Sequence, residues 1–566
     1  MQFSVTQRIL GLLLISFSLT LLPPMGVSLW YQDEGLSAFI IAFFVMSGIG
    51  VLCWFPARHK KKELHLHDGF MITAVFWTVL SVVGALPFLL IPNYEMTLAQ
   101  AVFEAVSGFT TTGATVINQL GSLPKSILYY RQQLQWLGGL GIIVLAVAVL
   151  PMLGIGGMQL YKAETPGPMR DEKLTPRIGQ TAKALLYIYI SLTLACAIAY
   201  WIAGMTLFDA IGHSFSTVAT GGFSTHDASL GYYNSPVIEI IAMIFIILGS
   251  LNFTVHFVVW HKYLFPINHR DTRNRVFSKN SVSERRIKSL KISAERFKRV
   301  FSKNSVYEQR IKSLKIYASR LKRVFSKNSV SELLKSLKIY ASQLKKGLHH
   351  YWQDIQGRVF INIVLVLIAI TVIVLMWQGV YTHFWTALRH GSFAVISIIS
   401  STGYITADFS VWPLFLPVLI LGSGFIGGCV GSTAGGFRVI RLILLYKQAI
   451  REIMRLIHPN AVIAVKIGQK KVPDNVAQAV GGFALLYMAS YVFLSLLFLA
   501  TGVDYLTAFS GVAATLNMTG PALGNIAVTY GDISDTGLWI LSFAMLLARL
   551  EIFTLLVLLT PAFWRR

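Results

Sequence analysis

Long hydrophobic runs alternate with short polar connections along most of this chain. Runs near residues 8–30 and 36–56 are each long enough to cross a bilayer as a helix, which takes about 20 apolar residues. Four similar units follow, each with a long apolar helix, a short amphiphilic helix, a glycine-bearing segment and a second long helix. The pattern predicts an all-α polytopic membrane protein of about ten transmembrane helices, with the four pseudo-symmetric units arranged around one pore.

The predicted domains follow this division. In chain order they are 1–68 with two N-terminal transmembrane helices, pore unit 1 at 69–180, pore unit 2 at 181–269, a basic cytoplasmic insertion at 270–347, pore unit 3 with an intramembrane loop at 348–475, and pore unit 4 at 476–566. If each unit crosses the membrane twice, the polar connections between units lie on one side. They are rich in lysine and arginine, so the positive-inside rule places them, and both termini, in the cytoplasm.

The composition supports a membrane protein and gives no sign of an enzyme. Hydrophobic residues make up 54% of the chain and charged residues 13%, whereas soluble domains carry about 25% charged residues. The cysteines, Cys53, Cys196 and Cys429, each lie inside an apolar run and form neither a disulfide framework nor a zinc motif. We find no cluster of carboxylates, metal ligands or activated nucleophiles, and therefore predict that the chain is not an enzyme.

Hydroxyl residues precede a glycine at the same place in the units, in what we call the four glycine segments. Their central residues are Thr111, Thr112 and Gly113; Thr220, Gly221 and Gly222; Ser401, Thr402 and Gly403; and Met518, Thr519 and Gly520. Non-helical backbone at membrane depth is tolerated where it is buried in protein or lines a watery cavity. We therefore predict a selectivity filter in which these residues bind a potassium ion, since backbone carbonyls can replace the water of an alkali cation. The alternative is close helix packing through small residues.

The surroundings of the segments repeat as well. Ser107, Ser216 and Ser397 each lie six residues before the glycine of their unit. Short helices are expected at 96–110, 206–218, 384–399 and 504–514, and each would aim its partly negative C-terminal end at the ion. The fourth segment lacks the paired hydroxyl residues of the first and third, so we expect a less symmetric wall there.

The chain resembles the Trk/Ktr/HKT superfamily of potassium transporters, and most closely its bacterial TrkH/TrkG branch. The residues that carry the resemblance are Ser107-Gly-Phe-Thr-Thr-Thr-Gly-Ala-Thr115, Thr217-Val-Ala-Thr-Gly-Gly-Phe-Ser-Thr225, Gly431-Ser-Thr-Ala-Gly-Gly-Phe-Arg-Val-Ile-Arg441 and Arg549-Leu-Glu-Ile-Phe553. It covers nearly all of the chain except about 270–347. It implies potassium uptake across the bacterial inner membrane by a homodimer that associates with a cytosolic nucleotide-binding regulatory subunit of the RCK type.

A glycine-rich stretch interrupts the last helix of unit 3. Its glycines include Gly424, Gly427, Gly428, Gly431, Gly435 and Gly436. Each glycine costs a helix roughly 1 kcal/mol relative to alanine, so we predict a broken helix with a loop at membrane depth, 424–436, called the glycine-rich loop below. The resemblance implies that this loop obstructs the pore beneath the filter. Close packing against a neighbouring helix is the alternative.

Arg549 lies in the middle of the apolar run 538–560. A charge at membrane depth is expensive and marks a candidate functional site. The resemblance implies that this arginine lies in the conduction path, where its charge would oppose a cation and form part of the gate. The alternative is a structural ion pair with Glu551 or a distant carboxylate.

The segment 270–347 departs from the family pattern. It holds 23 lysine and arginine residues against five acidic ones, which supply 18 of the formal net charge of +24. Arg-Val-Phe-Ser-Lys-Asn-Ser-Val begins at Arg275, Arg299 and Arg323, which favours short basic amphipathic helices. Binding to anionic lipid, docking to a cytosolic partner or nucleic acid, and a functionally silent loop expansion all remain open.

A proton- or sodium-coupled cation carrier of the same fold is the alternative function. Proton coupling would need titratable residues inside the helices. The candidates, Glu104, Asp209, His213, Arg389, His390 and Asp504, are few and scattered.

Overall fold

The computed structural model describes residues 3–58, 66–92, 94–144, 178–260, 346–347, 349–468, 470–552, 555–556, 558 and 560–561. The described chain divides into two compact parts, one made of Met1–Thr254 with Asp354–Arg566, the other of Val255–Gln353. The predicted basic insertion, 270–347, lies outside the described residues except for 346–347. In the smaller part, His256 Nδ1 lies 2.5 Å from the Tyr351 hydroxyl.

Helices occupy the four ranges where short amphiphilic helices were predicted. They are α6 (Leu98–Phe109), α10 (Leu207–Val218), α18 (Phe384–Ile399) and α22 (Tyr505–Leu516). Side chains cap three of them at the start, because Thr97, Thr206 and Asp504 each accept a hydrogen bond from the amide three residues further on. Such caps satisfy backbone donors that the first helical turn leaves free.

The other described α-helices range from four to 26 residues in length. In the N-terminal part and units 1 and 2 they are α1 (Phe3–Leu19), α2 (Leu22–Tyr31), α3 (Leu36–Ala57), α4 (Leu66–Val83), α5 (Leu86–Leu89), α7 (Lys125–Val144), α9 (Ile178–Ile202), α11 (Pro236–Ser250) and α12 (Phe253–Val259). In units 3 and 4 they are α17 (Ile355–Trp377), α19 (Leu416–Ser423), α20 (Val439–Ile457), α21 (Asp474–Leu499) and α23 (Asp535–Arg549).

Within the described ranges, six spans are long and apolar enough to cross a membrane. They are Thr6–Tyr31, Leu36–Ala57, Met71–Leu89, Lys183–Ile202, Ile355–Trp377 and Asp474–Leu499. The other crossings expected from the sequence fall on α7, α11 with α12, α19 and α23. These helices are shorter, more polar or interrupted, because they line the interior of the protein instead of facing only lipid.

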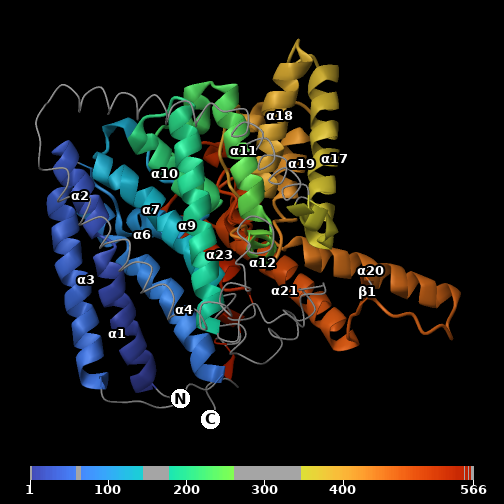
Figure 1. Cartoon of the computed structure of the whole chain (residues 1–566), viewed down its shortest axis with the longest axis horizontal. Coiled ribbons are helices and arrows are strands. Elements are labelled where there is room, and N and C mark those ends of the chain that lie inside the picture. The colour runs from blue at the N-terminus through green and yellow to red at the C-terminus, as the bar shows by residue number, and fades with distance from the viewer. Residues whose placement is uncertain are drawn as a thin grey trace, which may run out of the picture. The chain divides into compact units, whose positions relative to one another are not determined.

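The units form a closed ring of helix contacts. Each short helix packs against the first long helix of its own unit, α4, α9, α17 or α21. The second long helix of each unit packs against the short helix of the next, which gives the pairs α7 with α10, α11 with α18, and α19 with α22. The pair α23 and α6 closes the ring from unit 4 back to unit 1. The N-terminal helices lie outside the ring and together at the left of Figure 1, with α1 against α3 and α4, and α2 against α7.

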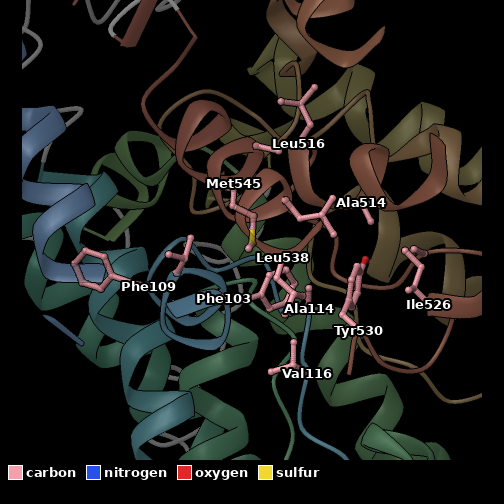
Figure 2. Packing of buried hydrophobic residues seen from close by; sticks show 14 of the residues in the cluster. Phe103, Phe109, Ala114, Val116, Ala514, Leu516, Ile526, Tyr530, Leu538 and Met545 are labelled. Atoms are coloured by element: carbon pink, nitrogen blue, oxygen red, sulfur yellow. The ribbon is translucent and has the colours of Figure 1, made fainter. Parts of the chain in front are cut away.

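Apolar packing secures the junction of units 4 and 1 (Figure 2). The rings of Phe103 and Tyr530 lie with their centroids 5.3 Å apart. Leu538 and Met545 of α23 are fully buried in the same cluster. The Tyr530 amide donates to the Thr115 carbonyl at 2.8 Å. Contacts between opposite ends of the sequence thus hold the first and last units together.

The remaining elements are short. A 3₁₀ turn follows each glycine segment, namely η1 (Leu120–Ser122), η4 (Ser229–Tyr233), η6 (Phe409–Val411) and η7 (Gly524–Ile526). The strands β1 (Lys466–Ile467) and β2 (Lys470–Lys471) pair antiparallel, with Lys466 opposite Lys471.

Candidate functional site

The four short helices end in the same backbone motif. At the end of α6, the Thr111 amide donates to the Gly108 carbonyl at 3.0 Å and the Thr112 amide donates to the Ser107 carbonyl at 2.8 Å. The second of these bonds, from an amide to the carbonyl five residues earlier, recurs in the other units. The amides of Gly221, Thr402 and Thr519 donate to the carbonyls of Ser216, Ser397 and Ala514, each at 2.8 Å. This is the Schellman motif, which satisfies carbonyls at the helix end and turns the chain sharply. The serines six residues before each glycine therefore mark the acceptor of this bond in units 1 to 3.

The turning residue of each motif lies in the left-handed region although none is glycine. The φ angles are 59° at Thr111, 51° at Thr220, 56° at Ser401 and 57° at Met518. Glycine usually occupies this position because a Cβ costs roughly 1–2 kcal/mol there, and a β-branched threonine is unusual. Strain of this kind persists where the surrounding structure enforces it and concentrates at functional sites.

The glycine that ends each segment also has a positive φ, and each touches the next segment. A Cβ added at Gly113 would lie 2.2 Å from the Gly221 carbonyl oxygen, and one at Gly222 would lie 2.0 Å from that of Thr402. A Cβ at Gly403 would lie 2.1 Å from the Thr519 carbonyl oxygen. A Cβ at Gly520 closes the circle at 2.8 Å from that of Thr112. The carbonyls of Thr112, Gly221, Thr402 and Thr519 therefore occupy equivalent places around one axis.

The fourth segment has backbone φ angles similar to those of the first. Met518 and Gly520 have φ angles of 57° and 78°, close to the 59° and 82° of Thr111 and Gly113. The backbone thus turns in the same way in all four segments, while the contact that an added Cβ at Gly520 would make, at 2.8 Å, is looser than the 2.0–2.2 Å at the other three glycines. The predicted asymmetry of the fourth wall stays a prediction. A shared backbone is what coordination by carbonyls requires, since side chains take no part in it.

One face of the ring opens into a small cavity of about 70 Å³ lined by Gly113, Gly222, Gly403 and Gly520. Arg131, His226 and Asp227 also line it. Arg131 Nε lies 2.7 Å from Glu104 Oε1, and both side chains are almost fully buried. Charges so far from water are retained when they are paired and hydrogen-bonded, so this pair braces the cavity wall.

The glycine-rich loop lies against the opposite end of three segments. The Gly435 amide donates to Ser401 Oγ at 2.5 Å, and Thr220 Oγ1 lies 3.1 Å from Thr433 Oγ1. A Cβ at Gly424 would lie 2.7 Å from Thr519 Cγ2. Thr220 and Ser401 are the left-handed residues of their segments, so the loop contacts the side chains of the residues whose backbone is strained.

The loop folds back on itself between α19 and α20. The Phe437 amide donates to the Phe425 carbonyl at 3.1 Å, and the Val439 amide to the Gly428 carbonyl at 3.2 Å. The φ of Gly427 is +69°, and a Cβ there would lie 2.2 Å from the Gly435 carbonyl oxygen. Glycine is therefore required at this close approach, and the predicted break in the helix is present.

Arg549 ends α23 beneath the fourth segment. Its Nη1 donates to Met518 Sδ at 3.6 Å and its Nη2 donates to the Gly138 carbonyl at 3.2 Å. No described residue accepts a hydrogen bond from its buried Nε, and the side chain is only 3% exposed. Arg549 also borders a cavity of about 20 Å³ with Gly435, Gly436 and Met518. The arginine, the loop and the fourth segment thus meet at one place.

The expected alternative partner of Arg549 is engaged elsewhere. Glu551 lies 3.1 Å from Arg438 and 3.1 Å from Arg441. Arg438, at the end of the loop, has a left-handed φ of 77°. These pairs tie the end of the loop to the chain just after Arg549.

Most of the other polar residues weighed as candidates have structural partners; the exception is His390, whose buried Nδ1 has no hydrogen bond to any described residue. Arg389 lies 2.7 Å from Glu239. His213 lies 2.8 Å from the Asp209 carbonyl and 2.9 Å from Ser224 Oγ. Sequence reasoning missed Arg131, whose signal was a charged residue within the apolar part of unit 1.

Comparisons with known proteins find one family over most of the chain. The family model TrkH, described as a cation transport protein, matches residues 35–280 and 332–566. The Trk system potassium uptake protein TrkH of Vibrio parahaemolyticus is 46% identical over 565 residues, which cover 100% of both chains. The Trk system potassium uptake protein TrkG of Escherichia coli is 36% identical over 561 residues, 99% of this chain and 98% of that protein. The crystal structure of the potassium transporter TrkH from Vibrio parahaemolyticus matches with a TM-score of 0.79 and 44% identity, covering 100% of both chains.

Proposed function

The chain belongs to the TrkH family of cation transport proteins, and from this premise we propose that it takes up potassium through a pore whose filter is the ring of glycine segments. The family is one of transporters, not of enzymes. The relatives named above are potassium uptake proteins, which supports potassium as the cation carried here.

The closed ring carries this proposal. Four equivalent carbonyls, each placed against the glycine of the neighbouring segment, surround one axis. A dehydrated alkali cation needs such a ring of oxygens to replace its hydration shell. The ion-binding residues are then Thr111, Thr112, Thr220, Gly221, Ser401, Thr402, Met518 and Thr519, with the four glycines holding the backbone in place.

The glycine-rich loop and Arg549 form the gate in this proposal. The loop contacts segments 2, 3 and 4. Arg549 donates a hydrogen bond to the side chain of Met518, which also belongs to segment 4. A fixed positive charge beside the cation path raises the energy of a cation there, and more strongly in a low-dielectric interior than in water. Movement of the loop and displacement of the guanidinium would together open the path.

Single-channel recording with cation substitution tests the proposal. Reconstituted protein should conduct, and its reversal potential should follow the potassium gradient when sodium replaces potassium on one side. Flux that stops when a proton or sodium gradient is removed, with no potassium-dependent conductance, would instead establish the coupled carrier.

We propose that the protein works as a homodimer in the bacterial inner membrane, with both termini in the cytoplasm, together with a cytosolic nucleotide-binding subunit of the RCK type. The names of the relatives as parts of a Trk system support partner subunits. Anionic lipid is a proposed partner of the segment 270–347, which contains 23 basic and five acidic residues. Each point has its own test. Light scattering on purified protein tests the homodimer, and reporter fusions at each terminus test the orientation. Vesicle binding by a variant lacking the insertion tests the contact with lipid.

A further inference from the structure

The second glycine segment differs from the other three in the residue just before its glycine. That residue is threonine in segments 1, 3 and 4, and its hydroxyl bonds within its own unit. Thr112 Oγ1 lies 2.8 Å from Thr110 Oγ1, Thr402 Oγ1 lies 2.8 Å from Ser400 Oγ, and Thr519 Oγ1 donates to the Ala514 carbonyl at 3.3 Å. Segment 2 has Gly221 instead, so it lacks this internal brace.

A glutamine from a neighbouring unit takes the place of that brace. Gln135 of α7 is fully buried, and its Nε2 donates to the Gly221 carbonyl at 2.6 Å. Its Oε1 accepts from the Phe223 amide at 3.1 Å. One side chain thus holds the backbone on both sides of Gly222. On the same side of α7, Gln132 Nε2 donates to the Phe223 carbonyl at 3.3 Å.

Gly221 is glycine because Gln135 occupies the adjoining space. Its φ does not lie in the left-handed region, in contrast to that of Gly222 at +79°, so the backbone would accept another residue. A Cβ at Gly221 would, however, lie 2.5 Å from both Oε1 and Cδ of Gln135. A threonine at 221 and a glutamine at 135 therefore exclude each other in this packing.

We infer that Gln135 is a positioning residue for cation selectivity, because it sets the place of one of the four ring carbonyls. The inference rests on the proposed function of the ring as a filter. A carbonyl oxygen has two lone pairs, so Gly221 can accept from Gln135 and still face a cation. Loss of the Gln135 side-chain amide frees the Gly221 carbonyl to move. It also leaves the buried backbone amide of Phe223 without its acceptor, which is unfavourable in a protein interior.

The test compares two buried glutamines of α7 in full-length reconstituted protein. Gln135→Leu should lower the potassium-to-sodium permeability ratio, read from reversal potentials, on the order of fivefold, as expected for one buried hydrogen bond. Gln133→Leu is the matched control, because Gln133 also donates a 2.6 Å bond from a buried amide, but to the Thr20 carbonyl outside the ring. It should lower thermal stability to a similar extent and leave the ratio unchanged.

A pair of variants separates positioning from general stability. Gly221→Thr alone should disrupt the segment and lower the ratio, because its Cβ meets Gln135. Gly221→Thr combined with Gln135→Ala should recover most of the ratio, since it gives segment 2 the threonine of the other three and the room to hold it.

Three outcomes would overturn the inference. These are a parental ratio in Gln135→Leu, an equal loss in Gln133→Leu, and a double variant no better than Gln135→Leu. Failure of the proposed function looks different, because the parent itself would then show no potassium-selective conductance. If the parent is selective and a substitution at Gly403 alters the ratio while those at Gln135 do not, the filter stands and this inference falls.

Discussion

Gly403→Ala tests the ring at a place where the backbone and the packing both require glycine. The φ of Gly403 is +82°, where an L-residue costs roughly 1–2 kcal/mol. The new Cβ would lie 2.1 Å from the Thr519 carbonyl oxygen and 2.7 Å from Pro521 Cδ. The carbonyl must retreat by roughly 0.9 Å for that contact to reach 3.0 Å, below which real Cβ atoms are essentially never found. One of the four oxygens that we propose to coordinate the cation is then out of place.

We expect the potassium-to-sodium permeability ratio of Gly403→Ala to fall by on the order of tenfold, equivalent to about 1.4 kcal/mol of lost discrimination. Reversal potentials under bi-ionic conditions measure it. Gly379→Ala is the control, because Gly379, the turning residue at the end of α17, also has a positive φ, +67°, but has nothing within 4 Å of an added Cβ. A folded Gly403→Ala protein with the parental ratio would refute the role of the ring in selectivity.

Three further predictions concern the gate and the cavity wall. Deleting several residues within 424–436 should raise potassium flux into proteoliposomes, because the loop contacts three segments from below; a folded deletion variant that conducts no more than the parent would place the gate elsewhere. Arg549→Ala should raise flux while Arg549→Lys stays near the parent, whereas stable alanine protein with lower flux would contradict the electrostatic barrier. Glu104→Gln should lower the free energy of unfolding by about 3 kcal/mol, because it leaves the buried Arg131 without its charged partner; denaturant titration in detergent measures this, and an unchanged midpoint would show that the pair contributes little.

Local signals in the sequence predicted the short helices well. The range 206–218 became Leu207–Val218, and 384–399 became Phe384–Ile399. Both boundaries have local causes: Thr206 caps the start of one helix, and the Schellman motif ends each of them. Similar reasoning located the break in the helix of unit 3, because closely spaced glycines weaken any helix.

Contacts between distant parts of the chain could not be predicted in the same way. Gln135 and Gly221 are 86 positions apart, and no periodicity relates them. The sequence did hold a clue, since Arg131, Gln132, Gln133 and Gln135 crowd one helix of a hydrophobic protein, and buried polar groups need partners. The partner of Glu551 was missed for the same reason, because Arg438 and Arg441 approach it only through the folding of the loop.

The ring of glycines has a consequence for how the four segments evolve. Each segment fixes the next through a contact between a glycine and a carbonyl, so the fit of any one copy depends on its neighbours. Substitutions at residues in direct contact are not additive in their energetic effects. We therefore expect epistasis to run around the ring, so that a change tolerated in one copy is harmful until the adjacent copy has changed too. The backbone path constrains the four copies more than their side chains do, because Thr111, Thr220, Ser401 and Met518 differ in side chain while their φ angles stay between 51° and 59°.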